Sequence, residues 1–423
     1  MAADLLEQSR RILEGVDDIE QGNPFQPTNE LCEVAGGVAE VSSFANVAAF
    51  TTDDGLVLVD TGSPITGQVV HTRIRSWSPQ RLNTAVYTHG HIDHVFGTAV
   101  FDEESATNGW ERPVVVAHQD VNPRFDRYCL TAGYNAVINQ RQFRIPGLQW
   151  PTDYRRPDTT YVDRHDLDVG GLAVELHHAR GETDDHTWVW VPERRTLCTG
   201  DLFIWCTPNA GNPQKVQRYA RDWAVALRVM ADLGAELLLP GHGLPIAGAA
   251  QVRQALVDTA DLLDSLVDQT LALMNEGARL DEVVHAVQAP AHLLERPYLQ
   301  PIYDEPEFIV HNLWRLYGGW YDGNPAHLKP APDAQLAGEL AALAGGAARL
   351  AERATELAAQ GDLRLAGHLA ELATQAAPDD PALHRVRADV FGQRARTERS
   401  LMARGVFSWA EAESSDKAGG APG

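Results

Sequence analysis

Apolar and polar positions follow two different rhythms along the chain, and the rhythm changes near residue 250. Between residues 31 and 250, short runs rich in valine, leucine and aromatic residues alternate with helical or turn-like stretches, as expected for buried strands. The strand-like runs are 38–41, 56–60, 84–88, 114–117, 173–177, 188–191 and 237–240. This alternation predicts two sheets with helices on their outer faces, an αββα sandwich.

From about residue 251 the apolar residues recur at helical spacing, as at Leu256, Leu263 and Leu266, which predicts an all-helical region. The chain has 423 residues, whereas a single hydrophobic core stops growing near ~250–300 residues, so more than one domain is expected. The predicted class is α+β. The predicted parts are an N-terminal helix and linker (1–30), the αββα domain (31–250), the helical domain (251–410) and a disordered tail (411–423).

Charge and hydropathy narrow the class of protein further. The formal net charge is −23, which repels phosphate backbones and argues against a nucleic-acid partner. No apolar run approaches the ~18 residues of a membrane span, so stable membrane insertion is not expected. The first residues lack a basic segment followed by an apolar core, so no secretory signal is expected. An acidic, cytoplasmic enzyme is the prediction.

The densest group of candidate metal ligands directly follows one of the strand-like runs. Residues 88–94 read Thr-His-Gly-His-Ile-Asp-His, which places three imidazoles and a carboxylate within six positions. Imidazole suits zinc, iron and nickel, and the added carboxylate supplies enough donors for two ions. In an extended segment His89 and His91 point the same way, while Asp93 and His94 lie beyond and reach a neighbouring ion. The segment therefore predicts a binuclear metal site.

The pattern His-x-His-x-Asp-His resembles the signature of the metallo-β-lactamase superfamily of hydrolases. Three further segments occur in the order typical of that family: Leu-Val-Leu-Val-Asp-Thr-Gly at 56–62, Cys-Thr-Gly-Asp at 198–201 and Leu-Leu-Leu-Pro-Gly-His-Gly at 237–243. The resemblance implies that Asp60 orients a metal-bound histidine, that Asp201 bridges two ions and that His242 is a further ligand.

One motif departs from the common pattern and indicates a branch of the family. Where most members carry Gly-His-Thr, residues 181–183 read Gly-Glu-Thr. A glutamate there resembles the alkylsulfatases, in which it ligates the first metal. The resemblance then implies two zinc ions with these ligands: His89, His91 and Glu182 on the first, Asp93, His94 and His242 on the second, and Asp201 between them.

Two residues are candidate catalytic groups. Asp93, beside the bridging Asp201, is expected to fix the attacking hydroxide, since metal binding lowers the pKa of water from near ~16 to about 7. His186 lies close to Glu182 in sequence. Its interpretation as a metal ligand, as a proton donor or as a buried histidine with satisfied hydrogen bonds stays open.

A second resemblance lies downstream and is independent of the metal motifs. Residues 313–325 read Leu-Trp-Arg-Leu-Tyr-Gly-Gly-Trp-Tyr-Asp-Gly-Asn-Pro, similar to the start of the alkylsulfatase dimerisation domain. The likeness continues through paired helices to about residue 405. It implies a homodimer.

A sulfate ester is an anion, so its pocket needs arginine, lysine or asparagine side chains. The candidate substrate-binding residues are Asn135, Arg141, Lys215 and Arg218. The alkylsulfatases carry a threonine-leucine-arginine-glycine stretch where residues 207–215 read Thr-Pro-Asn-Ala-Gly-Asn-Pro-Gln-Lys, so this loop departs from the family. Turn-forming or salt-bridging roles are the alternative for such residues.

The leading hypothesis is a binuclear metal-dependent hydrolase that cleaves a small-molecule sulfate ester or a related anionic ester. The altered loop leaves a second hypothesis, hydrolysis of a carboxylic ester, lactone, thioester or β-lactam on the same metals. A third is a non-catalytic dimeric scaffold, against which the complete ligand set argues.

Overall fold

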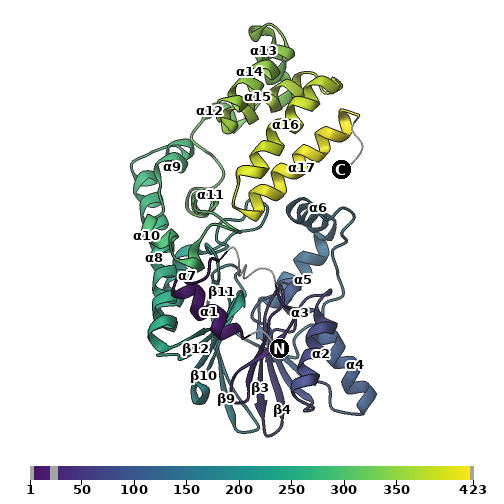
Figure 1. Cartoon of the computed structure of the whole chain (residues 1–423), viewed down its shortest axis with the longest axis vertical. Coiled ribbons are helices and arrows are strands. Elements are labelled where there is room, and N and C mark those ends of the chain that lie inside the picture. The colour runs from purple at the N-terminus through teal and green to yellow at the C-terminus, as the bar shows by residue number, and fades with distance from the viewer. Residues whose placement is uncertain (1–3, 20–26, 420–423) are drawn as a thin grey trace. The chain divides into compact units, whose positions relative to one another are not determined.

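The computed structural model describes residues 4–19 and 27–419, which form two compact units. The first unit comprises the described residues up to 132 together with 151–319, and the second comprises 133–150 and the described residues from 320 onward. Figure 1 labels the helices and some of the strands of the two units.

The first unit contains a seven-stranded sheet in the order β1-β2-β3-β4-β5-β6-β7. Its strands are β1 (Leu31–Ala35), β2 (Val38–Val41), β3 (Val47–Thr52), β4 (Gly55–Val59), β5 (Leu82–Val86), β6 (Val114–His118) and β7 (Thr159–Tyr161). Strands β1 to β4 form an antiparallel meander, whereas β4 to β7 are parallel. The carboxyl ends of the parallel strands therefore meet at one edge of the sheet.

A six-stranded sheet in the order β13-β12-β11-β10-β9-β8 forms the second half of this unit. Its strands are β8 (Arg164–Val169), β9 (Leu172–His178), β10 (Thr187–Val191), β11 (Thr196–Ile204), β12 (Leu237–His242) and β13 (Ile246–Ala247). Strands β11 and β12 are parallel, and the other neighbours are antiparallel. The carboxyl ends of β11 and β12 therefore lie at the same edge of this sheet.

The two sheets bury their facing sides against each other. Val57 and Val86 of the first sheet belong to one apolar cluster with Leu176, Val189 and Leu239 of the second. The β-branched residues pack well on such pleated surfaces, which explains why these runs form strands. Helices cover the outer faces (Figure 1), so the predicted αββα sandwich is confirmed.

The remaining helices of the first unit surround this sandwich. They are α1 (Leu5–Leu13), α2 (Gly67–Trp77), α3 (Ile92–Val95), α4 (Thr98–Asn108), α5 (Val121–Leu130), α7 (Ala220–Ala231), α8 (Ala249–Asn275), α9 (Leu280–Ala286), α10 (Ala291–Leu294) and α11 (Pro306–Gly318), with short 3-10 turns at Pro192–Arg194 and Pro297–Leu299. The helix predicted within residues 1–30 is present as α1, while residues 20–26 of the predicted linker region lie outside the described residues.

The boundary predicted at residue 250 differs from the compact units. Helix α8 does begin there, but its Leu256 and Leu263 lie in one apolar cluster with Trp223 of α7 and Leu238 of β12. The helices up to residue 319 therefore pack with the sheets as one unit. Helical periodicity predicts that a segment forms a helix, but it does not predict against which core the apolar face of that helix packs.

The second unit is helical, as predicted. It comprises most of α6 (Ala132–Phe143), together with α12 (Pro325–Leu328), α13 (Asp333–Ala344), α14 (Ala347–Ala359), α15 (Leu363–Ala376), α16 (Pro381–Thr397) and α17 (Leu401–Lys417). The prediction that disorder begins at residue 411 is wrong up to Lys417, because α17 continues to that residue. Ser414 is buried there and accepts a 2.6 Å hydrogen bond from Arg387. Residues 420–423 lie outside the described part.

Candidate metal centre

Five segments of the first unit bring their polar side chains to one edge of the sandwich. The segment after β5 carries His89 and His91 and continues into α3, which carries Asp93 and His94. The loop between β9 and β10 supplies Glu182, β11 supplies Asp201, and β12 ends at His242. Because β5, β11 and β12 are members of parallel pairs, their carboxyl-terminal halves deliver these residues to the same edge.

The structure brings all seven predicted metal ligands together in two groups. The first group is His89, His91, Glu182 and Asp201, and the second is Asp93, His94 and His242. In the first group, Glu182 Oε2 lies 3.5 Å from both His89 Nε2 and His91 Nδ1, and the two ring nitrogens are 2.7 Å apart.

The second group and Asp201 show similar spacing. His242 Nε2 lies 3.6 Å from Asp93 Oδ2 and 3.3 Å from Asp201 Oδ2. Asp201 Oδ1 lies 3.4 Å from His94 Nε2, while Asp201 Oδ2 lies 3.8 Å from His89 Nε2. Asp201 thus contacts histidines of both groups, as a bridging ligand requires. Tetrahedral zinc with ligands at roughly 2.0–2.1 Å would separate its donors by roughly 3.3–3.4 Å.

Buried polar atoms without partners indicate that this donor set fits metal ions. Within the described residues, His94 Nε2, Glu182 Oε2 and Asp201 Oδ1 are buried and form no hydrogen bond. Leaving such atoms unpaired is costly, and each of these three residues belongs to one of the two groups of candidate ligands. Four imidazoles and three carboxylates are also the donor types that zinc binds. The residues present therefore fit a binuclear site.

The carboxylates of the centre differ in their electrostatic surroundings. Burial raises the pKa of Glu182 well above its usual range, although Arg218 acts in the opposite direction. Burial also acts to raise the pKa of Asp201, but His242 and His94 beside it hold that pKa well below its usual range. A cation bound beside a buried carboxyl group such as that of Glu182 favours its ionised form and so lowers its pKa.

Asp60 supports the centre from beneath, as the family resemblance implies. Its Oδ2 lies 2.7 Å from His94 Nδ1, and it accepts hydrogen bonds of 2.8 Å from both the backbone and the hydroxyl of Thr88. Asp60 has a φ of +62°, a strained conformation for a residue with a side chain. These contacts fix the ring of His94 so that its Nε2 faces Asp93 and Asp201.

The loop after β11 holds Glu182, a role that the sequence did not reveal. Asn209 donates a hydrogen bond to Glu182 Oε1, and Arg218 lies 3.3 Å from the same oxygen and also donates to the Glu182 carbonyl. The Arg218 side chain is only 2% exposed. Arg218 was predicted to bind substrate, which stays a prediction; its side chain contacts Glu182, the predicted metal ligand. The partners are 27 and 36 residues apart in sequence, so no local pattern links them.

Asp304 fixes this loop and was also missed. It is fully buried and accepts hydrogen bonds from the backbone of Gly211 at 2.6 Å and of Glu305 at 2.7 Å. Burial raises the pKa of Asp304 to about 7 despite these donors. The only sequence signal was its place within the aromatic and acidic stretch after Tyr303.

A second buried pair secures the histidine segment. Asp185 accepts a 3.0 Å hydrogen bond from the backbone of Gly90 and lies 2.8 Å from Arg124 Nε. Arg124 also forms an ion pair with Asp184. These contacts tie the loop that carries Glu182 to the segment that carries His89 and His91.

His186 is fully buried and stacks on His89, with ring centroids 4.6 Å apart. Its Nε2 lies 3.2 Å from the carbonyl of Thr199, two residues before Asp201. Burial lowers the pKa of His186 to about 3, so the ring is neutral near pH 7. His186 Nδ1, however, is buried without a hydrogen-bond partner in the described residues, so only one ring nitrogen is satisfied and a role as proton donor stays a prediction.

The other predicted substrate-binding residues lie on two segments. Asn135 and Arg141 are on α6, which belongs to the second compact unit, and their role at the centre stays a prediction. Lys215 follows β11 in the first unit and is partly exposed. Burial lowers the pKa of Lys215 to about 7, and the nearby Arg218 acts in the same direction.

Comparison with known families agrees with this architecture. Residues 42–242 match the family described as metallo-beta-lactamase superfamily, and residues 279–417 match alkyl sulfatase dimerisation. The chain therefore contains a metallo-β-lactamase domain followed by an alkyl sulfatase dimerisation domain. The predicted resemblance is confirmed.

Individual relatives are alkylsulfatases. A linear primary-alkylsulfatase of Pseudomonas sp. (strain ATCC 19151) is 28% identical over 361 residues, covering 80% of this chain and 68% of the relative. An (R)-specific secondary-alkylsulfatase of Pseudomonas sp. is 25% identical over 389 residues, covering 84% and 58%. The solved structure of the stereoselective inverting sec-alkylsulfatase Pisa1 from Pseudomonas sp. matches 93% of this chain and 66% of that chain, with a TM-score of 0.81 and 24% identity. The chain thus spans about three fifths to two thirds of the length of these relatives.

Proposed function

We propose that this protein is a metal-dependent hydrolase that cleaves the sulfate ester of an alkyl alcohol or a closely related anionic ester. The proposal rests on one observation: Glu182 lies together with six residues of the family's usual metal-ligand motifs, in two groups of potential ligands. The alkylsulfatase names of its relatives and the matched dimerisation domain support the same substrate class.

Two divalent ions at this centre would lower the pKa of a coordinated water and polarise the substrate oxygen. His89, His91 and Glu182 would hold one ion, Asp93, His94 and His242 the other, and Asp201 both. Zinc is the proposed metal because the imidazole and carboxylate donors and their spacing suit it.

Exposure of the ligands indicates where substrate approaches. The side chains of Asp93 and His91 are 20% and 17% exposed, whereas those of the other five ligands are at most 8% exposed. The centre is therefore open on the side of these two residues. Asp93 can accept the proton of the attacking water there, since its carboxylate is the most accessible of the three.

The positive groups beside the opening are suited to a sulfate ester. The cationic form of Lys215 lies in the field of Arg218, Asp93 and Glu182, and it is the group proposed to contact the sulfuryl oxygens. Arg218 acts indirectly by holding Glu182. Asn135 and Arg141 are proposed as further contacts for the substrate.

Assembly and location are part of the proposal. A homodimer is supported by the matched dimerisation domain. A cytoplasmic location is supported by four cysteines that are all free thiols, as in a reducing compartment. Among the described residues, no helix has both the length and the apolar character needed to cross a lipid bilayer.

The test is release of inorganic sulfate from a panel of primary and secondary alkyl sulfates by the zinc-loaded protein. The same preparation is assayed with p-nitrophenyl carboxylic esters and with a lactone. We expect sulfate release that a chelator abolishes and zinc restores. Turnover of the esters or the lactone without any sulfate release would contradict the proposed substrate class while leaving the metal centre in place.

A further inference from the structure

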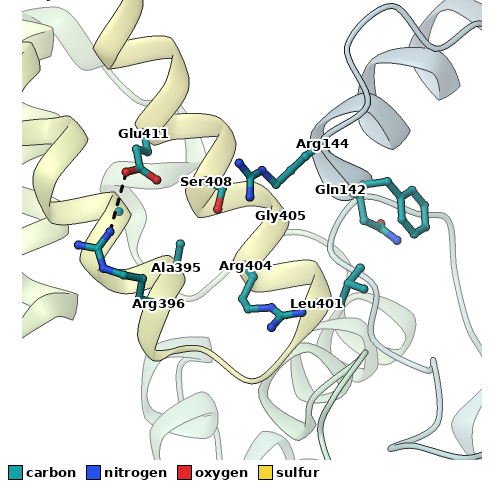
Figure 2. Close-up of a pocket in the computed structure, with 11 residues that line it drawn as sticks. Gln142, Arg144, Ala395, Arg396, Leu401, Arg404, Gly405, Ser408 and Glu411 are labelled. Atoms are coloured by element: carbon teal, nitrogen blue, oxygen red, sulfur yellow. Dashed lines mark ion pairs between the residues drawn. The ribbon is translucent and has the colours of Figure 1, made fainter. Parts of the chain in front are cut away.

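A cavity of about 510 Å³ lies in the second compact unit, within the range of small-molecule sites. It is formed by the end of α6 and the turn that follows, together with the facing parts of α16 and α17. Figure 2 shows the side chains that line it. None of these residues belongs to the metal centre, so the cavity is a separate feature of the molecule.

Arginine dominates the polar lining of this cavity. Arg144, Arg396 and Arg404 line it, and Glu411 is its single carboxylate. Glu411 lies 4.0 Å from Arg396, the outer limit of an ion pair (Figure 2). Within the described residues, Arg144 and Arg404 have no ion pair. Three exposed guanidinium groups and one carboxylate therefore line the cavity, which leaves an excess of two positive charges.

This concentration of positive charge is unusual in so acidic a chain. The sequence contains 58 acidic and 35 basic residues, so an arginine has many potential carboxylate partners. Other arginines of the same unit form ion pairs with such carboxylates: Arg349 pairs with Glu352, and Arg387 pairs with Glu371 at 2.7 Å. Like charges brought together repel each other unless an anion lies between them.

The shape of the cavity depends on close packing between its walls. Gly405 of α17 lies so near α6 that a Cβ atom there would be 2.1 Å from the carbonyl oxygen of Gln142. Arg144 follows α6 with a φ of +57°, a conformation that side-chain-bearing residues rarely adopt. The backbone thus turns at Arg144 where the cavity begins, and the nearby hydroxyl of Ser408 adds a neutral hydrogen-bonding group.

We propose that this cavity binds a small organic polyanion with two or more carboxylate or phosphate groups. A guanidinium group offers paired N–H donors that match the oxygens of a carboxylate or phosphate. Arg144 and Arg404 each contact one such group, and Arg396 exchanges its long contact with Glu411 for the ligand. A volume of about 510 Å³ accommodates a tricarboxylate or a sugar bisphosphate rather than a single inorganic ion.

The experiment measures binding of tricarballylate and of fructose 1,6-bisphosphate to the full-length, zinc-loaded protein by isothermal titration calorimetry. Fructose is the uncharged comparison, and zinc content is measured before and after titration. The test variant is R144Q/R404Q. The matched control is R349Q/R385Q, which removes the same charge from two exposed arginines of the unit that do not line the cavity.

We expect at least one polyanion to bind, fructose not to bind, and affinity to fall as salt rises. R144Q/R404Q should weaken binding by roughly tenfold or more, whereas R349Q/R385Q should not change it. R144K/R404K keeps the charge but loses the paired donors, so it should restore binding only in part. All variants should keep the wild-type melting temperature without ligand and hydrolyse substrate at the wild-type rate.

Three results would overturn the proposal. The first is absence of binding by the wild-type protein. The second is equal binding by the test and control variants, which would place the anion elsewhere, such as at the metal centre. The third is dissociation of R144Q/R404Q into monomers while R349Q/R385Q stays dimeric in light scattering, which would mean that a second copy of the chain covers the cavity. Failure of the wild-type protein to hydrolyse sulfate esters would contradict the proposed function of the metal centre, whereas the binding measurements test the cavity alone.

Discussion

At the scale of single residues, the centre depends on side chains whose roles can be separated by substitution. Glu182 is a ligand in the proposed centre, whereas the His186 ring lies against the Thr199 carbonyl and the face of His89. Both are buried and both lie in the loop between β9 and β10. They therefore form a matched pair for testing ligand assignment.

Glu182→Ala is expected to lower metal content by about one ion per chain, because it removes one donor of the first group. His186→Ala is expected to keep both ions and to lower kcat, because the backbone before Asp201 loses its hydrogen-bond partner. Elemental analysis after dialysis and steady-state kinetics measure the two effects. Two ions retained in the Glu182 variant would disprove its role as a ligand.

Glu40 of β2 gives a prediction about pH. It is fully buried, both carboxyl oxygens lack a hydrogen-bond partner in the described residues, and it lines a cavity of about 10 Å³, large enough for about one water molecule, beside Asp60 and Cys198. Burial raises the pKa of Glu40 well above its usual range. The folded state thus keeps a proton that the unfolded state loses above about pH 4.5.

As pH rises above that value, ionisation favours the unfolded state and Glu40 lowers the free energy of unfolding by about 1.4 kcal/mol per pH unit, until its folded pKa is reached. Glu40→Gln should remove this loss and flatten the dependence of stability on pH. Urea unfolding from pH 5 to 8 measures it. An unchanged slope would mean that Glu40 is ionised in the folded state.

The convergence of the seven predicted ligands could be anticipated from sequence because six of them occupy short contiguous motifs and the seventh stands at a motif position. The supporting residues could not. Asn209 and Arg218 lie in one loop and contact Glu182 in another. The local sequence around a polar loop residue does not distinguish whether it binds substrate, shapes a turn or holds a ligand.

At the scale of elements, the loop after β11, whose sequence predicts a departure from the alkylsulfatase pattern, positions Glu182. Its backbone is anchored by Asp304, and its side chains Asn209 and Arg218 hold Glu182. The strands were predictable from alternating runs, but the boundary at residue 250 was not, since the apolar face of α8 packs on the sheets.

Asp304→Ala should therefore act on the metal centre from a distance. It leaves the buried Gly211 amide without its 2.6 Å partner, at a cost of about 1–3 kcal/mol in stability. We expect lower affinity for the first metal and a lower kcat, with KM changing less. Metal titration and kinetics check this. Glu295→Ala, which changes an exposed acidic residue of the same unit, is the control and should leave affinity unchanged.

At the scale of the whole molecule, the metal centre joins segments that the chain separates widely. Residues between His89 and His242 converge there from both sheets, and Gly241 approaches Asp201 so closely that a Cβ atom would lie 2.1 Å from its Oδ1. Without a cation, three carboxylates and four imidazoles with unpaired buried atoms would face one another. The centre should accordingly contribute to the stability of the sandwich as a unit.

Removal of metal should lower the stability of the folded chain. Because ions bind the folded state in preference to the unfolded one, stability rises by RT ln(1 + [M]/Kd), or about 2.7 kcal/mol at a free metal concentration of one hundred times Kd. A chelator should therefore lower Tm by several degrees, and zinc should restore it. Glu182→Ala should show a smaller shift and His186→Ala the full shift. If the chelator left the wild-type Tm unchanged while removing the metal, the converging segments would be held by packing alone, and the unpaired buried atoms of the centre would need another explanation.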